Sequence, residues 1–358
     1  MPKDNETVPF PFLTDDGPSE TAGPQSFALD QMVRCEQCLR ANPPTRVNCL
    51  YCAAVLPLNE TTIKLQKPAL RPLEKWERGY NNILLPSTAN LTDAGLAEAA
   101  DALKLAKTDL SRIVSLEIPL PLARAATMDE ASLVQFRLAR LELNTLIVPD
   151  AELGLDETAP IKVRAIGIDD NGFWVYQTPE IPATRVSWPN VLLIVTGRLI
   201  VKRVELKEQK AARAENRILD ASEFFTDESV LEIYASEQAA PYRIAANSFD
   251  FSCLENQKTL VAGENISALV KLFRDYAPNA VFDESFNSVR KALEAVWPSE
   301  QQNETRGWRR ERPGKYSIGS VNEISNESQF LRYSRLRYHL LFQAKLITDA
   351  KPTTDEDS

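Results

Sequence analysis

Residues 35–52 read CEQCLRANPPTRVNCLYC, which places two Cys-x-x-Cys pairs ten residues apart. Each pair brings two thiolates to one ion from a single turn, and the spacer is short enough for all four to share that ion. The segment is too small to build a hydrophobic core of its own, so the ion would supply the folding energy. The pattern predicts one structural Zn²⁺ per chain, held by Cys35, Cys38, Cys49 and Cys52.

Four thiolate ligands fill a tetrahedral shell and leave no open position for water or substrate, which indicates a structural ion and not a catalytic one. Two other interpretations stay open, a pair of redox-active dithiols and an iron site. The fifth cysteine, Cys253, follows an apolar run and is expected to be a buried thiol. His339 is the only histidine in the chain, so a Cys-His nucleophile is not expected.

The cysteine spacing, with Asn42 between the pairs, resembles the Ran-binding-protein-2 type of zinc finger and related bacterial four-cysteine zinc ribbons over residues 33–55. The resemblance implies a small ribbon that contacts protein or RNA. Glycine often follows each pair in such ribbons, but Leu39 and Ala53 stand there, so each turn would carry a side chain at positive φ. Leu39-Arg40 replaces the Thr-Phe pair associated with ubiquitin binding, and ubiquitin is therefore not the expected partner.

Positive charge gathers around the cysteine pairs. Between Met32 and Lys75 the chain has seven Lys and Arg residues against three acids, a local charge of +4 before the cluster's own charge of about −2. RNA-binding members of the resembled family present arginine and aromatic side chains beside the ion. The residues that could do so here are Arg34, Arg40, Arg46 and Tyr51.

Short apolar runs and amphipathic stretches alternate over residues 80–152 and predict a small α/β domain. Their order, β-α-α-β-α-β with a proline-bracketed middle strand, resembles the C-terminal domain of the bacterial ribosomal stalk protein. This resemblance concerns topology and implies a two-layer fold. The expected strands are 82–85, 120–124 and 144–148, and the expected helices are 93–105, 108–116 and 129–141.

Residues 158–298 show a β-rich pattern. Alternating runs on either side of the turn 169–172 predict a hairpin, and further strand-like runs extend to Asn247. The amphipathic stretch 265–276 predicts a helix with apolar residues at i, i+3, i+4 and i+7. Several hairpins closed by one helix resemble a pleckstrin-homology-like barrel over residues 160–276. We therefore expect a barrel-like β domain with C-terminal helices.

The fold class expected for the whole chain is multidomain α+β. The charged run 202–216 is expected to interrupt the strands around it. The segments outside the two larger domains are expected to be an acidic disordered arm (1–30), the zinc ribbon (31–58), a linker (59–79), a polar and basic loop (299–325), a helix (326–346) and an acidic tail (347–358).

Length, charge and motif content limit the class of protein. The chain has 358 residues and a net charge of −9, of which residues 1–30 and 346–358 carry −8, so total charge neither supports nor excludes an anionic partner. No apolar run approaches the roughly 20 residues that cross a bilayer, and no secretory signal is evident. We expect a cytoplasmic protein without membrane insertion. Phosphate-binding loops, dinucleotide fingerprints and hydrolase motifs are missing from the sequence, which argues against an enzyme.

A second basic segment lies nearer the C-terminus, where arginines surround a tryptophan in a pattern that could grip phosphates and stack bases. Its residues are Arg306, Trp308, Arg309, Arg310 and Arg312. The function expected from all these features is that of a non-enzymatic zinc-binding adaptor that contacts a protein partner. The alternative is a single-stranded-RNA-binding or ribosome-associated protein that uses the ribbon and this segment. An enzyme of unrecognised type is the third interpretation.

Overall fold

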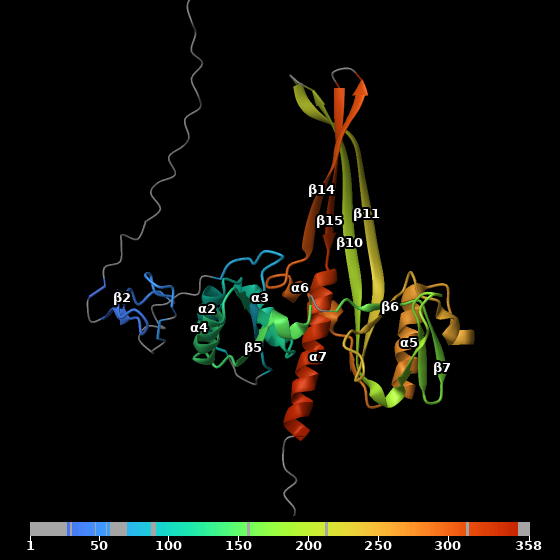
Figure 1. Cartoon of the computed structure of the whole chain (residues 1–358), viewed down its shortest axis with the longest axis horizontal. Helices are drawn as coiled ribbons and strands as arrows, with labels where there is room; N and C mark the ends of the chain where they lie inside the picture. Colours follow the sequence, from blue (N-terminus) through green and yellow to red (C-terminus); the bar gives the residue numbers. More distant parts are fainter. Residues whose placement is uncertain are drawn as a thin grey trace, which may run out of the picture. The chain divides into compact units, whose positions relative to one another are not determined.

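The structure is a computed structural model that describes residues 27–28, 31–46, 48–54, 56–57, 70–86, 91–155, 158–211, 214–312 and 315–349 (Figure 1). The chain divides into two units, Met1–Lys67 and Pro68–Ser358, and each is described by itself. Most of the expected acidic arm (1–30) and acidic tail (347–358), and the first half of the linker (59–79), lie outside the described residues. Those three expectations stay predictions.

The first unit contains a short antiparallel ribbon in which β1 (Val33–Arg34) pairs with β2 (Ala41–Asn42). Its buried hydrophobic cluster consists of Val33, Cys35, Cys49 and Leu56. Two of these four residues are cysteines, so burial of aliphatic side chains stabilises this unit little.

The N-terminal part of the second unit is a three-stranded antiparallel sheet in the order β4-β3-β5, together with helices α2 to α4. The β-α-α-β-α-β order expected from the sequence is confirmed. Thr92 and Thr127 begin two of the helices, each accepting a hydrogen bond from an N–H of the first turn. The elements are β3 (Tyr80–Leu84), α2 (Asp93–Leu103), α3 (Lys107–Ser115), β4 (Leu120–Ala125), α4 (Met128–Ala139) and β5 (Thr145–Pro149).

A seven-stranded sheet continues the second unit in the order β14-β15-β10-β11-β12-β6, with β13 paired to β10. Strands β10 and β11 have 21 and 22 residues and pair along almost their whole length, with the hairpin of β14 and β15 beside them (Figure 1). The strands are β6 (Ile161–Val163), β10 (Val191–Ala211), β11 (Ala214–Ala235), β12 (Tyr242–Ala245), β13 (Val281–Asp283), β14 (Glu300–Arg312) and β15 (Lys315–Ser325).

Two expectations about these strands are wrong. The charged run 202–216 does not interrupt the β structure but continues β10 and β11, and the expected loop 299–325 forms β14 and β15. The charges fit because side chains of opposite sign can pair between neighbouring strands, as Lys202 of β10 does with its diagonal neighbour Glu223 of β11 at 2.8 Å. An exposed sheet needs no apolar alternation, and the sequence pattern therefore resembles a loop.

A separate antiparallel sheet consists of β7 (Ala165–Asp169), β8 (Gly172–Tyr176) and β9 (Thr184–Ser187). The hairpin expected at residues 169–172 is confirmed, and a Cβ on Gly172 would lie 2.2 Å from the carbonyl oxygen of Val186. Within the described residues the sheets do not close into a barrel, so the barrel-like expectation is wrong. The α+β fold class is confirmed.

Helices complete the second unit. The helix expected at 265–276 is confirmed within α5 (Ala262–Tyr276), which packs against the sheet of β7 to β9, and α6 (Phe286–Leu293) is a further helix of two turns. The C-terminal helix is α7 (Glu327–Asp349), and its Phe330, Tyr333 and Leu336 are buried. No helix among the described residues is both long and apolar enough to span a membrane.

Helix α7 ties several elements together. Its buried residues share one hydrophobic cluster with the small α/β region and α6. Arg332 forms an ion pair with Asp150, which follows β5, with 2.7 Å between Nη1 and Oδ1. Arg337 forms an ion pair with Asp283 of β13, with 2.5 Å between Nε and Oδ2. The helix therefore fixes the position of the small α/β region against the large sheet.

Candidate metal centre

The two cysteine pairs fold into turns of the same design. In the first turn the Cys35 N–H donates to the carbonyl of Arg40 at 3.0 Å, and the Leu39 N–H donates to the carbonyl of Cys35 at 2.9 Å. These two bonds close the turn on its first cysteine and bring the second cysteine to the same side. The second turn has the same two bonds. The Cys49 N–H donates to the carbonyl of Ala54 at 2.7 Å, and the Ala53 N–H donates to the carbonyl of Cys49 at 3.0 Å.

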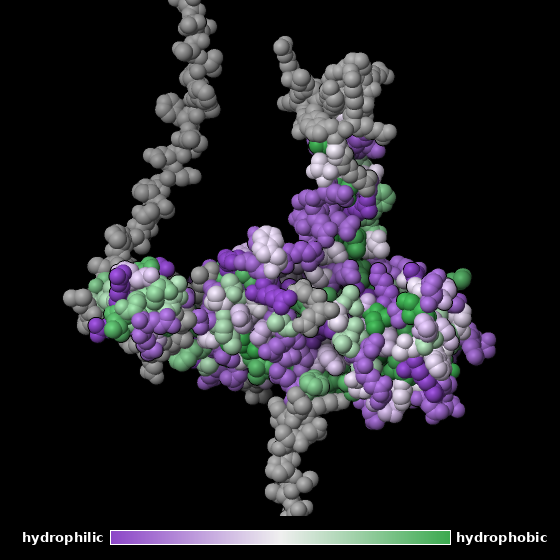
Figure 2. Space-filling model, viewed as in Figure 1, coloured by the Kyte–Doolittle hydropathy of each residue, from purple (hydrophilic) through white to green (hydrophobic). Residues whose placement is uncertain are grey.

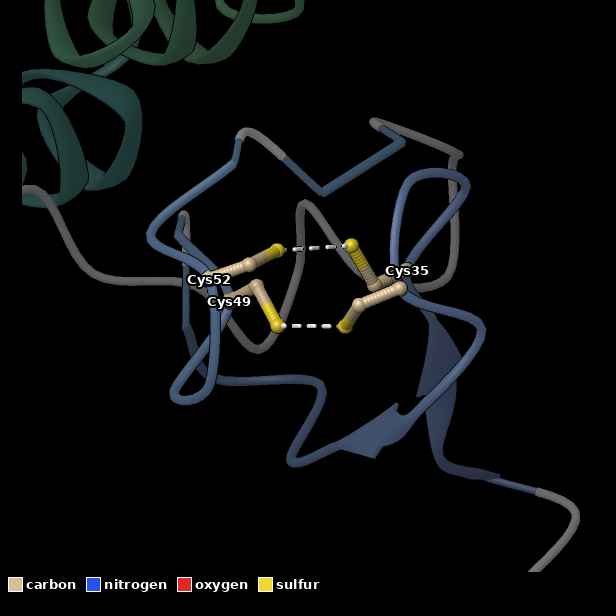
Figure 3. Close-up of side chains that lie close together, drawn as sticks. Cys35, Cys49 and Cys52 are labelled. Carbon is tan, nitrogen blue, oxygen red and sulfur yellow. Dashed lines mark hydrogen bonds between the residues drawn. The ribbon is translucent and has the colours of Figure 1, made fainter.

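The four thiol groups point toward one another from the two turns (Figure 3). The Sγ atoms of Cys35 and Cys52 are 3.6 Å apart, those of Cys38 and Cys49 are 3.5 Å apart, and all four lie within 4.8 Å of one another. Sulfurs bonded at about 2.3 Å to one tetrahedral zinc ion would lie about 3.8 Å apart, whereas a disulfide would bring them to about 2.0 Å. The cysteines are free, and the cluster can hold a metal ion such as zinc.

Hydrogen bonds favour the thiolate form of Cys49. Burial raises the pKa of this thiol, but the N–H groups of Tyr51 and Cys52, with side chains that include Asn42, outweigh burial and lower the pKa to about 6. The Ala54 N–H lowers the pKa of Cys52, yet burial and the neighbouring thiols raise it to about 12. A divalent ion would offset the negative charge of four thiolates held this close together.

Asn42 connects the two turns. Its side chain is fully buried, and Nδ2 donates to the carbonyl of Arg40 at 2.9 Å and to Sγ of Cys49 at 3.4 Å. Its Oδ1 accepts from the Leu50 N–H at 2.8 Å. Such contacts orient metal ligands, so Asn42 positions Cys49 while crosslinking β2 to the second turn.

The residues that follow the cysteine pairs have the backbone conformation expected from the sequence. Leu39 has φ 60° and Ala53 has φ 59°, both in the left-handed region. A residue with a Cβ pays roughly 1–2 kcal/mol there. The unit therefore folds with strain at two positions where glycine would carry none.

We expect Ala53→Gly to tighten zinc binding about two- to fivefold. Removing the Cβ relieves the left-handed strain, and the greater freedom of glycine in the unfolded chain, roughly 0.5–1 kcal/mol, offsets only part of the gain. Competition with a chromophoric chelator measures the affinity. The matched control is Ala54→Gly, because Ala54 does not have positive φ and glycine there should weaken binding. Equal affinities for the two variants would contradict the prediction.

The four ligand-contact residues expected on this unit all lie exposed around the cluster. The guanidinium of Arg40 lies 4.7 Å above the centre of the Tyr51 ring, so these two side chains form one surface. Arg34 lies near them through its Nε, which donates to the carbonyl of Leu39 at 3.0 Å. The Nε of Arg46 donates to the carbonyl of Asn48 at 3.5 Å.

Two exposed apolar residues lie beside the cysteine cluster, and neither was predicted from the sequence to contact a ligand. Leu39 is 62% exposed and Leu50 is 51% exposed, and Tyr51 between the second pair of cysteines is 56% exposed. Each leucine directly follows a cysteine ligand, a position that the turn forces outward. That spacing was the available signal for them.

The second basic segment lies elsewhere. Its residues Arg306, Trp308, Arg309, Arg310 and Arg312 are part of strand β14, not of a loop, and their side chains lie outside what the structure describes. Their expected role in ligand contact stays a prediction. Cys253 is half-buried in the second unit, and burial raises its pKa to about 11, which disfavours the nucleophilic thiolate.

Comparisons with protein-family models, with curated proteins and with solved structures found no match to this chain. The class of site is therefore defined by its geometry alone, as a four-cysteine cluster that can hold a metal ion.

Proposed function

We propose that the protein is a non-enzymatic adaptor whose first unit is a Ran-binding-protein-2-like ribbon, folded by one structural zinc ion and used to contact a protein partner. The observation that carries this proposal is the closed set of four sulfurs within 4.8 Å. Four thiolates complete a tetrahedral shell, so such an ion has no position for a substrate or a reactive water. Its contribution is to folding.

The surface beside the cluster supports a protein partner. Leu39, Leu50 and Tyr51 expose apolar groups within one small unit, and Arg40 lies over the Tyr51 ring. Figure 2 shows apolar surface on the visible face of this unit. Aromatic and arginine side chains are enriched at the energetic centres of protein interfaces. We call the exposed residues Leu39, Arg40, Leu50 and Tyr51 the ribbon surface.

Single-stranded RNA is the second candidate ligand, and the stacked pair of Arg40 and Tyr51 favours it. An aromatic ring beside a guanidinium can stack a base and neutralise a phosphate. RNA binding would weaken as salt rises, because each neutralised phosphate releases counterions. Contact with a protein through exposed leucines would depend on salt much less.

Crosslinking in cells, with and without nuclease, separates these candidates. We expect the full chain to give a protein adduct that survives nuclease and is lost in the variant Leu39→Asn with Leu50→Ser. Asparagine tolerates the left-handed conformation of residue 39, so this variant should keep its zinc. Glu36→Gln, an exposed change outside the ribbon surface, is the matched control. Adducts that disappear with nuclease and with Arg40→Ala would instead identify RNA, and adducts unchanged in every variant would exclude the ribbon surface.

A further inference from the structure

A cavity of about 500 Å³ lies within the second unit, among the segment 70–75, strand β4 and the junction from α6 to β14. Cavities that bind small molecules typically measure about 300–1,000 Å³. The first turns of α7 form another side of the cavity through Ser328, Gln329 and Arg332. All of its described lining residues belong to the second unit, and none is a cysteine of the cluster.

One side of the cavity is apolar and firmly held. Leu103 of α2, Leu122 of β4 and Trp297 line it, and each is at most 3% exposed. The Trp297 Nε1–H donates to Asn81 Oδ1 at 2.9 Å, which fixes the orientation of the indole. This wall offers a rigid surface to the apolar body of a ligand.

Cations dominate the polar part of the lining. Glu300 is the only acid among the lining residues, and it pairs with Lys75 at 3.1 Å. Two carboxylates outside the lining form ion pairs with lining cations: Glu77 pairs with Arg71, and Asp150 pairs with Arg124 and Arg332. Five cationic side chains thus face three carboxylates that pair with them, and a fourth carboxylate, that of Glu294, accepts from the lining residues Ser299 and Gln329, which leaves an excess charge of +1. The five are Arg71, Lys75, Lys104, Arg124 and Arg332.

Excess positive charge lies at the place where two arginines share one carboxylate. Asp150 accepts from Arg332 Nη1 at 2.7 Å through Oδ1 and from Arg124 Nε at 3.0 Å through Oδ2. It also accepts from the Gly79 N–H and from Asn81 Nδ2, both at 2.9 Å, and it is only 5% exposed. Burial raises the pKa of Asp150, but Arg332 and these other partners lower it further, so the carboxylate is ionised. A partly buried net charge of +1 remains.

Donors of this arginine pair remain available to a ligand. The bonds that the described residues make do not include Nε or Nη2 of Arg332, or Nη1 of Arg124. The side chain of Arg332 is 19% exposed and that of Arg124 is 14% exposed. These nitrogens are not among the fully buried polar atoms that lack a partner, so solvent can contact them. Guanidinium groups with unused donors at the wall of a cavity match the oxygens of an anion.

We propose that this cavity binds a small organic anion, in which a carboxylate, sulfonate or phosphate group is joined to an apolar body. The anionic group accepts from Arg332 and Arg124, where the charge excess and the unused donors coincide. The apolar body lies against Leu103, Leu122 and Trp297. Lys75 and Lys104 add attraction without holding the fold. Among the described residues the Nζ of Lys104 bonds only the carbonyl of Leu70, and the ion pair of Lys75 is exposed.

The test uses two fluorescent probes that differ in one group: 8-anilinonaphthalene-1-sulfonate, which is anionic, and N-phenyl-1-naphthylamine, which lacks the sulfonate. We expect the full chain to bind the sulfonate at one site and the neutral probe at least tenfold more weakly. The variant Lys75→Gln with Lys104→Asn should weaken sulfonate binding roughly tenfold, because it removes two positive charges from the lining. Asparagine suits residue 104, whose φ is 55°.

Two further variants make the test decisive. Lys107→Asn removes a cation that pairs with Asp93 outside the cavity, and it should leave both affinities unchanged. Ser328→Trp should fill the cavity and abolish binding of the sulfonate, with thermal unfolding used to verify that the chain is folded. Sulfonate binding that persists in Ser328→Trp would place the probe on another surface and overturn the proposal. Equal affinity for the two probes, or no binding of the sulfonate at millimolar concentration, would overturn it as well.

Discussion

Cys49→Ser is expected to abolish zinc binding by the full chain and to unfold the first unit while the second unit stays folded. Zinc binding to small four-ligand modules supplies about 10–16 kcal/mol of apparent free energy, and that energy is the folding energy of the module. Cys49 is also the best-supported ligand, since it accepts bonds from Asn42 and from the Tyr51 N–H. Loss of the Cys49 sulfur should weaken zinc binding by well over roughly 100-fold. This exceeds the roughly 10- to 100-fold loss that is typical when a residue that hydrogen-bonds to a metal ligand is removed.

Metal analysis of the purified chain measures the first part of this expectation, and backbone NMR measures the second. Wild type should contain one zinc per chain and Cys49→Ser none, with the resonances of residues 70–349 largely unshifted. Cys253→Ser is the matched control, because that thiol lies in the second unit and should leave the zinc content at one. Iron in the wild-type protein, or disulfides between the turns in a reduced extract, would instead support the alternative iron or redox interpretations.

The cysteine turns could be predicted in detail because their structure is local. Two pairs with a fixed spacing determine which atoms can meet, and the glycine that often follows each pair in the resembled ribbons indicated positive φ at Leu39 and Ala53. Asn42 was singled out only by the family resemblance, because the residues next to it in the sequence do not indicate that its amide contacts Cys49. The element order over residues 80–152 was also predictable, because each helix and strand there has its own apolar period.

The long strands could not be predicted, because what makes them strands is far away in the sequence. Lys202 pairs with Phe225 on β11 and with Ile324 on β15, and neither neighbour is visible in the local pattern. Strands whose side chains are mostly half-buried or exposed have mixed polar and apolar residues, as loops do. The cavity was hidden for the same reason, since Lys104 and Arg332 come from distant parts of the chain and meet only in the fold.

The second large effect is expected at a buried ion pair between β11 and β12. Glu232 is fully buried, and its Oε1 accepts from Arg243 Nη2 at 2.6 Å and Nε at 2.8 Å. Its Oε2 accepts from Ser334 of α7 at 2.5 Å and from the Tyr234 hydroxyl at 3.3 Å. Burial lowers the pKa of Arg243, but Glu232 and Glu327 raise it further, so the guanidinium stays charged. The pair anchors α7 to the large sheet.

We expect Glu232→Leu and Arg243→Leu each to lower the free energy of unfolding by about 3–5 kcal/mol, because Arg243→Leu leaves the buried Glu232 without a cation and Glu232→Leu leaves the largely buried Arg243 with only the exposed Glu327. The double variant should cost much less than the sum of the two, since no uncompensated charge remains. Its other polar neighbours stay satisfied: Tyr234 and Ser334 bond each other at 2.8 Å, and the Glu327 side chain is 58% exposed.

Urea unfolding followed by tryptophan fluorescence measures these costs, with the slope of free energy against urea expected to stay constant. Asp227→Ala is the matched control on the same strand. Its ion pair with Arg198 is as short, at 2.8 Å, but the arginine side chain is 52% exposed, so we expect a cost of at most about 1 kcal/mol. Single-variant costs at or below that of the control, or a double variant as unstable as the sum, would show that the Glu232 pair does not hold α7 in place. The expected result, a large cost in the single variants that the double variant largely recovers, would show that each residue of the pair compensates the buried charge of the other.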